Sequence, residues 1–166
     1  MDGTLTIAEQ ARSIEALYRS DAERLWRALV AYCADADLAS EVVAEAYAQA
    51  LRRGEAVRDP AAWTWRAAFK IASGQLKARR TADQVAAADP DAAASLGRPD
   101  RYADPDLQVA LRQLPEAQRA AVILFYYADL PVREIATRLG SNGLAVRANL
   151  SRGRRRLRQL LGDDDG

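Results

Sequence analysis

Residues 114–161 read LPEAQRAAVILFYYADLPVREIATRLGSNGLAVRANLSRGRRRLRQLL, and this stretch decides the fold of the C-terminal half of the chain. Ile135 and Leu139 recur at helical spacing, and Gly140 follows where a helix end often needs the left-handed conformation. Asn142 stands where a side-chain cap begins another helix. The pattern predicts a helix-turn-helix.

The second helix of this motif has an apolar face and a basic face. The apolar residues recur every three or four positions and can pack on the first helix: Val146, Leu150, Gly153, Leu157 and Leu160. The opposite face carries Leu144, Ala148, Ser151 and Arg155, flanked by Arg147 and Arg152. From 133 to 158 there are eight arginines against one acid, a balance of +7. Such a surface attracts phosphates and can bond guanine edges; the alternative is a helical hairpin whose solvated face is basic.

The N-terminal half predicts three helices. An apolar stripe indicates one amphipathic helix over 14–34, which Asp35 interrupts. A second helix, about 38–52, places Glu41, Glu45 and Gln49 on one face. A third runs from about 60 to 80, and no segment alternates with a period of two. The fold class is therefore predicted to be all-α.

The third helix is basic. Residues 66–80 hold five cations and no acid, and Arg66, Lys70 and Lys77 share one stripe. Trp63 and Trp65 stand at its start. Cations beside aromatic rings suit a groove for a separated DNA strand. The alternative is that one of the tryptophans belongs to the core, and the composition does not say which.

Two acidic segments lie outside the helical blocks. Residues 81–106 contain three prolines and six aspartates against two arginines, a balance of −4, which predicts a flexible acidic linker. Residues 162–166, GDDDG, form an acidic tail. Because basic patches neighbour both segments, we expect a compact, salt-sensitive state in the absence of DNA.

The composition excludes several kinds of chemistry. Cys33 is the only cysteine and there is no histidine, so an intramolecular disulfide, an imidazole metal site and a histidine-activated nucleophile are impossible. Cys33 is expected to be a core residue, and neither an enzyme nor a cofactor is expected. No stretch approaches the roughly 20 apolar residues of a membrane span, so a cytoplasmic location is expected.

Three segments together resemble a known family. They are SEVVAEAYAQAL (40–51), RDPAAWTWRAAFKIA (58–72) and LPEAQRAAVILFYYADLPVREIATRLG (114–140). They occur in the order seen in the extracytoplasmic-function (ECF) group of bacterial RNA polymerase sigma factors, and the resemblance spans about residues 14–161. It implies two small helical domains joined by the linker. These are a three-helix sigma region 2 (10–80), the linker (81–106), a helix-turn-helix sigma region 4 (107–161) and the tail (162–166).

The resemblance also implies partners and contact residues. The first domain would grip the clamp coiled coil of the largest subunit of the polymerase core through Glu41, Glu45 and Gln49. It would contact the −10 promoter element through six residues: Arg58, Trp63, Trp65, Arg66, Lys70 and Lys77. The second domain would contact the −35 element through another six: Asn142, Arg147, Ala148, Ser151, Arg152 and Arg155. The expected partners are polymerase core, promoter DNA and an anti-sigma protein, with no membrane and no small-molecule substrate.

Several positions depart from the family pattern. Lys70 and Gly74 replace a usual asparagine and aspartate in the −10 helix. Leu144 and Ala145 replace a usual glycine-threonine, and Asn149 a usual arginine. Promoter sequence therefore cannot be carried over from relatives. The departures leave open a sigma-like or helix-turn-helix regulator that binds DNA or polymerase without initiating transcription.

Overall fold

A computed structural model of the chain describes residues 6–86 and 104–162. Within these ranges it contains seven α-helices, one short 3-10 helix and no strand, which confirms the all-α prediction. The elements follow in the order α1 (Ile7–Cys33), α2 (Ala36–Arg53), η1 (Gly54–Ala56), α3 (Pro60–Ala86), α4 (Pro105–Arg112), α5 (Glu116–Tyr126), α6 (Val132–Leu139) and α7 (Gly143–Leu161).

Side-chain caps begin both helices of the first hairpin. Helix α1 begins before the expected position 14, because Thr6 and Glu9 form a capping box: the Thr6 N–H donates to Glu9 Oε2 at 2.8 Å, and the Glu9 N–H donates to Thr6 Oγ1 at 3.2 Å. Ala34 ends α1 in the left-handed region, with φ of 53°. Asp35 then caps α2 by accepting the Leu38 N–H at 3.0 Å, as its position in the sequence predicts.

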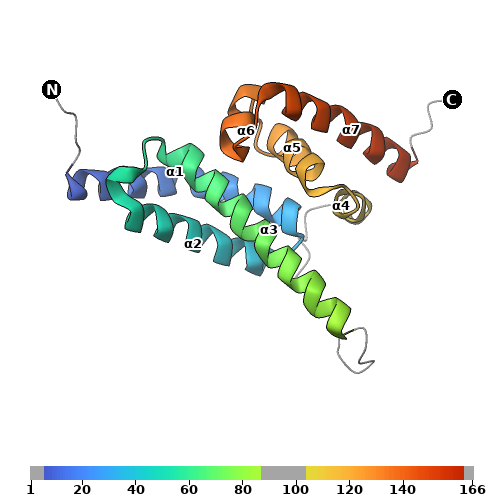
Figure 1. Cartoon of the computed structure of the whole chain (residues 1–166), viewed down its shortest axis with the longest axis horizontal. Helices are drawn as coiled ribbons and strands as arrows, with labels where there is room; N and C mark the ends of the chain where they lie inside the picture. Colours follow the sequence, from blue (N-terminus) through green and yellow to red (C-terminus); the bar gives the residue numbers. More distant parts are fainter. Residues whose placement is uncertain (1–5, 87–103, 163–166) are drawn as a thin grey trace.

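Helices α1, α2 and α3 pack side by side into the first domain (Figure 1). Leucines of α1 and alanines of α2 and α3 are buried in the core. Because alanine is small, the helix backbones can approach one another closely. The fully buried members include Leu25, Leu29, Ala39, Ala46, Ala50, Ala68 and Ala72. The domain is therefore an alanine-rich three-helix bundle.

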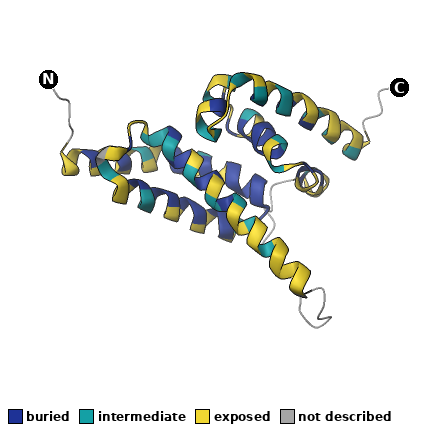
Figure 2. Ribbon diagram, viewed as in Figure 1, coloured by how far each residue is buried: buried dark blue, intermediate teal, exposed yellow. Residues whose placement is uncertain are grey.

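Helix α3 is longer than expected. It continues to Ala86, six residues past the predicted end at Arg80. No glycine or proline stands between Arg80 and Ala86, so nothing in the backbone stops the helix there. Its C-terminal half is mostly exposed and extends beyond the packed part of the domain (Figure 2). Residues 87–103 of the predicted linker lie outside the described residues, as does the tail from 163. The last three residues of the predicted linker are described: Asp104 caps α4, and Pro105 and Asp106 begin it.

Helices α4 to α7 form the second domain, and α6 and α7 are its helix-turn-helix. Gly140 ends α6 with φ of 64°, and Asn142 caps α7, so both turn signals in the sequence are confirmed. Gly153 lets α7 cross α5 closely, because a Cβ there would lie 2.8 Å from Cγ2 of Val122. Ile123 and Leu124 of α5 are fully buried in the core of this domain.

The two domains are in contact. Helix α6 lies on α3 and α5 lies on α1, and the buried apolar residues of both domains form one continuous cluster. Helix α7 packs on the other helices of its own domain and lies on the side away from α2 (Figure 1). The face of α7 that points away from its own domain is consequently left open to solvent.

Candidate nucleic-acid interface

Helix α7 presents a cationic face to solvent. Asn142 caps the helix by accepting the Ala145 N–H at 2.9 Å. The predicted −35 residues beyond this cap lie together on one surface, where Ala148 is half-buried and the others are exposed: Arg147, Ser151, Arg152 and Arg155. Leu144, at the start of the same surface, is 79% exposed. Residues 143–161 contain six arginines and no acid, so the helix itself carries a strongly positive net charge.

Two of the eight arginines in this region serve packing instead. The Arg154 Nε–H donates to Tyr126 Oη at 2.7 Å, and its guanidinium lies 5.1 Å from the ring centroid of Phe125. Arg138 is turned toward the first domain, with only 11% of its side chain exposed. Sequence reasoning counted both as surface charge, because the aromatic partners come from other helices.

The predicted −10 residues lie on or near α3. Arg58 precedes the helix, and Arg66, Lys70 and Lys77 are exposed along it. Arg66 is also engaged with the second domain: its Nη2–H donates to the Thr137 carbonyl at 2.9 Å. The structure therefore places three of these cations on α3 and Arg58 just before it, and among the four Arg66 contacts the second domain.

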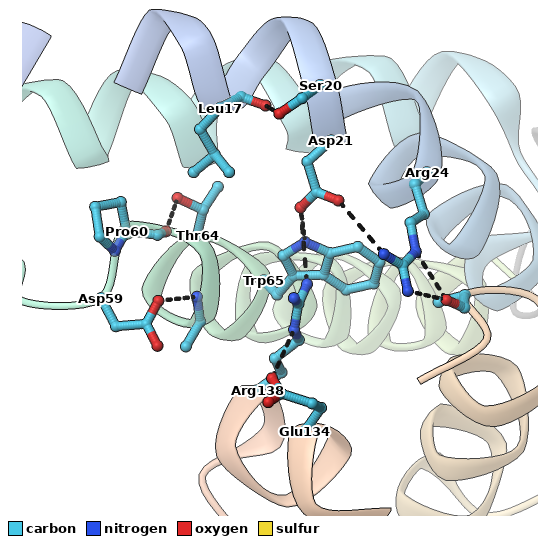
Figure 3. A network of polar contacts seen from close by, with 12 residues as sticks. Leu17, Ser20, Asp21, Arg24, Asp59, Pro60, Thr64, Trp65, Glu134 and Arg138 are labelled. Atoms are coloured by element: carbon cyan, nitrogen blue, oxygen red, sulfur yellow. Dashed lines mark hydrogen bonds and ion pairs between the residues drawn. The ribbon is translucent and has the colours of Figure 1, made fainter. Parts of the chain in front are cut away.

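The structure decides which tryptophan belongs to the core. Trp65 is 0% exposed, and its Nε1–H donates to Asp21 Oδ2 at 2.6 Å (Figure 3). Trp63 is half-buried, with the Arg53 guanidinium 5.9 Å from its ring centroid. Trp63 is thus the more accessible ring for a base, and Trp65 is covered in this arrangement.

The predicted polymerase face lies on α2. Glu41 and Glu45 are exposed and Gln49 is half-buried. Glu45 Oε1 accepts the Gln49 amide and the Arg52 guanidinium, each at 2.9 Å, and these hydrogen bonds lower the pKa of Glu45. Arg52 was not among the predicted residues, although its place one turn beyond Gln49 was visible in the sequence. Glu41 has no charge partner across α2 comparable to Arg52.

A groove of about 420 Å³ runs between α1 and α2 beside this face. Tyr18 is half-exposed at its edge and stands edge-on to Tyr47, with ring centroids 5.0 Å apart. The Trp26 Nε1–H donates to Ser40 Oγ at 3.0 Å across the groove. Periodicity does not predict this groove, because Tyr18 and Trp26 recur at helical spacing with the apolar residues of α1.

Cys33 is buried, and burial raises the pKa of its thiol to about 12, so the thiol stays protonated. In residues 6–86 and 104–162 no group of acids and thiols is placed to hold a metal ion. Over the same ranges, none of the helices combines the length and the apolar character that crossing a bilayer needs.

Comparison with known proteins agrees with this geometry. Residues 105–157, which are most of the second domain, match the family described as Sigma-70, region 4. The RNA polymerase sigma factor SigV of Bacillus subtilis is 29% identical over 145 residues, covering 84% of this chain and 86% of SigV. The ECF RNA polymerase sigma factor SigL of Mycobacterium tuberculosis is 30% identical over 162 residues, covering 93% of this chain and 92% of SigL.

Two solved structures share the fold. The sigma factor RpoE from Bartonella quintana, in complex with the anti-sigma factor NepR, superposes with a TM-score of 0.71 at 21% identity, covering 92% of this chain and 99% of RpoE. CnrH, in complex with the cytosolic domain of CnrY, gives a TM-score of 0.70 at 20% identity and covers 96% of each chain.

A helix-turn-helix domain of the region 4 type, docked on a second helical domain, defines the class as a sigma factor. The chain belongs to the ECF RNA polymerase sigma factors, since its similarity to SigL extends over nearly its whole length. This is a family of transcription regulators rather than of catalytic enzymes.

Proposed function

We propose that the chain binds the RNA polymerase core, directs it to promoters and thereby initiates transcription, without catalysing a reaction of its own. The observation that carries the proposal is the outward face of α7, where Arg147, Arg152 and Arg155 are exposed on a helix that contains no acid. A helix presented in this way fits the major groove.

The −35 element is the target of this face. Arg147 lies in the first turns of α7, beside Ala148 and one turn before Ser151. In helix-turn-helix proteins these early turns reach base edges, while later turns contact phosphates. The contact with the −35 element would be completed by Asn142 at the cap and by Arg152 and Arg155 farther along the helix. Because Leu144, Ala145 and Asn149 differ from the family pattern, the promoter sequence read here is its own.

The −10 element is the target of α3. Lys70 and Lys77 would follow the phosphates of a separated strand, Arg58 would stand before the helix, and Trp63 would stack on an unpaired base. Arg66 and Trp65 would join them only after release from their contacts with the second domain. All six predicted −10 residues belong to the first domain, which we place at residues 10–80.

The polymerase clamp is the target of α2. Glu41 and Glu45 form an exposed acidic edge, and Gln49 continues it. Electrostatic matching of this edge to a basic partner would set the orientation of docking. An anti-sigma protein is a further partner, in line with the complex of RpoE with NepR, and the site of action is the cytoplasm.

Run-off transcription with purified polymerase core on a library of promoter sequences tests the proposal. We expect transcripts from a small subset of sequences that share −35 and −10 elements. Binding to core without transcripts from any template would instead support a sigma-like protein that does not initiate. Arg147→Ala serves as the loss-of-reading variant, and Arg133→Ala, at an exposed position on α6, is the matched control.

A further inference from the structure

We propose that a groove at the C-terminal end of α1 binds a compact phosphate anion, of the size and charge of pyrophosphate, through four arginines. The arginines are Arg79 and Arg80 of α3, Arg112 of α4 and Arg119 of α5. None of them belongs to the surfaces assigned to DNA or to polymerase. The site therefore stands independently of the proposed function.

The groove is built from four helices and has a volume of about 270 Å³. The other lining residues come from the end of α1, the turn after it and α3: Tyr32, Cys33, Ala34, Asp35, Leu76 and Asp83. Pockets for drug-sized ligands measure roughly 300–1,000 Å³. The groove lies below that range, so it suits a compact anion rather than a whole nucleotide.

Arg119 is the most buried of the four arginines. It is 6% exposed, and its guanidinium lies 4.5 Å from the ring centroid of Tyr32, which is 3% exposed. The face of the ring holds the cation in place. The Arg119 Nε–H is buried and meets no hydrogen-bond acceptor among the described residues. Because a buried donor without an acceptor is costly, a ligand oxygen that reaches this N–H is favoured.

Two arginines of the groove are already paired with carboxylates of the chain. Arg79 Nη1 lies 2.7 Å from Asp35 Oδ2, and Arg80 Nη2 lies 2.7 Å from Glu116 Oε1. These pairs fix the direction of both side chains. A guanidinium has five N–H donors, so each of the two retains donors for a second anion.

Arg112 and Arg119 leave the groove with positive charge that the chain does not balance. Among the described residues, no carboxylate forms an ion pair with either arginine. Arg112 donates to the Ala34 carbonyl at the long distance of 3.5 Å. Cys33 adds no negative charge, because burial raises the pKa of its thiol to about 12. An anion with several charges is therefore the expected ligand.

Phosphate chemistry fits this set of donors. Guanidinium groups bind phosphate oxygens through pairs of parallel N–H···O bonds, and these charge-assisted bonds are stronger than neutral ones. Pyrophosphate has enough oxygens to meet the buried Arg119 and the exposed Arg112 at the same time. The partly enclosed position lowers the local dielectric constant, which strengthens the contacts relative to an open surface.

Isothermal titration calorimetry of the full chain with sodium pyrophosphate, at constant ionic strength, tests the site. We expect saturable binding of one anion per chain. Arg112→Gln should weaken the affinity about tenfold, because it removes a charged hydrogen-bond donor at an exposed position. Arg12→Gln, at an exposed position of α1 outside the groove, is the matched control and should stay within about twofold of wild type. Absence of saturable binding, or equal affinities of the two variants, overturns the site.

The acid at the edge of the groove allows a test in the opposite direction. Asp83 is exposed, and its carboxylate opposes an incoming anion. Asp83→Asn should therefore tighten the binding of pyrophosphate about threefold. Asp129→Asn, at an exposed aspartate outside the groove, should leave the affinity unchanged. A gain of affinity cannot arise from unfolding, and no gain in Asp83→Asn would contradict the proposed position of the anion.

Arg119→Lys tests the buried donor, because lysine keeps the charge but lacks the planar fork and the Nε–H. We expect binding about tenfold weaker than in wild type, with the same helix content by circular dichroism. Unchanged affinity in the folded variant would show that Arg119 does not hold the anion. If the variant loses helix, Arg112→Gln and Asp83→Asn decide the matter, since both positions are exposed.

The basic face of α7 is the competing site for the same anion. The double variant Arg152→Gln, Arg155→Gln removes two exposed cations from that face. We expect its affinity for pyrophosphate to stay within about twofold of wild type. If this variant loses binding and Arg112→Gln keeps it, the anion occupies the DNA-binding face, and the proposed site is wrong while the proposed function stands.

Discussion

The Arg138 guanidinium lies above the indole of Trp65, with 4.7 Å between its central carbon and the ring centroid. One residue comes from the helix-turn-helix and the other from the basic helix of the first domain. An arginine that the sequence places in a DNA-binding segment is used here between the domains. A tryptophan that the sequence offers for base stacking is covered by the same contact. The packing of the two domains therefore covers Trp65, one of the predicted −10 residues, and leaves the predicted −35 residues Arg147, Arg152 and Arg155 exposed.

Arg147 and Arg156 on α7 should respond differently to truncation. Arg147→Ala should cost about 1–3 kcal/mol on the preferred −35 sequence and little on scrambled DNA, because Arg147 lies in the turns that reach base edges. Arg156→Ala should weaken both alike and lower the salt slope by roughly one, as expected for a phosphate contact. Titrations on matched and scrambled duplexes at several salt concentrations measure this. Equal losses on both duplexes for Arg147→Ala would mean that Arg147 reads no sequence.

Charge reversal on α2 should weaken binding to polymerase core. The double variant Glu41→Lys, Glu45→Lys reverses the charge of the exposed acidic edge. We expect this variant to bind polymerase core more weakly than wild type, with the same helix content. Glu41→Lys alone should show most of the effect, because Arg52 already offsets the charge of Glu45. A pull-down titration measures affinity, with Glu15→Lys on α1 as control. Unchanged affinity would count against the polymerase face.

A side chain at Gly153 should destabilise the fold. Gly153→Ala places a Cβ 2.8 Å from Val122 Cγ2, so we expect the free energy of unfolding to fall by about 1–3 kcal/mol through overpacking between α5 and α7. Adding Val122→Ala should restore part of the loss. Gly74→Ala is the matched control, because no atom lies within 4 Å of its Cβ position, and it should stabilise α3 by about 0.5–1 kcal/mol. Denaturant unfolding gives all three values; a neutral Gly153→Ala would contradict the crossing.

Asp35 should make stability depend on pH in the acid range. Burial raises the pKa of this carboxyl, but hydrogen bonds from the Leu38 N–H and Arg79 outweigh burial and hold the pKa below its usual value. A depressed folded pKa means that Asp35 stabilises the fold above its unfolded pKa, about 3.9, and that this contribution is lost as pH falls through the folded pKa.

Asp35→Asn should accordingly lower the free energy of unfolding by about 1 kcal/mol at pH 7 and by less near pH 3. Asp37→Asn, at an exposed position in the same turn, should change little at either pH. Denaturant titrations at both pH values measure the difference. A loss of the same size at pH 7 and pH 3 would show that the charge of Asp35 contributes nothing.

Salt should open the free chain only in part. The Arg80–Glu116 pair has 58% and 36% of its side chains exposed, so ions can screen it. The Arg138–Asp21 pair has 11% and 12% exposed and is screened less. Small-angle scattering should therefore show a compact chain at low salt that expands modestly at high salt. The same extended shape at both salt concentrations would contradict a closed free state.

The features that the sequence predicts correctly depend on residues that are close together in the chain. Gly140 and Asn142 act on the backbone within a few residues, and Val146 and Leu150 repeat at the helical period, so the helix-turn-helix follows from neighbours in the chain. The start of α1 also has a local signal, because Thr6 and Glu9 have the spacing of a capping box. The predicted end of α3 at Arg80 is too early, because the composition changes there without a glycine or proline to stop the helix before Ala86.

The sequence by itself determined the features that depend on short-range chemistry: the helical class, the turn at Gly140, the caps at Asp35 and Asn142, the apolar stripes, the basic face of α7 and the acidic edge of α2. The resemblance of three segments indicated the family. Only the tertiary structure decided that Trp65 rather than Trp63 is buried, and that Arg138 points inward. Both outcomes depend on Asp21, a carboxylate from α1 that meets the indole and the guanidinium only when three helices have packed. Periodicity describes one helix at a time, so it cannot tell which distant side chain will satisfy a buried indole N–H or receive a cation.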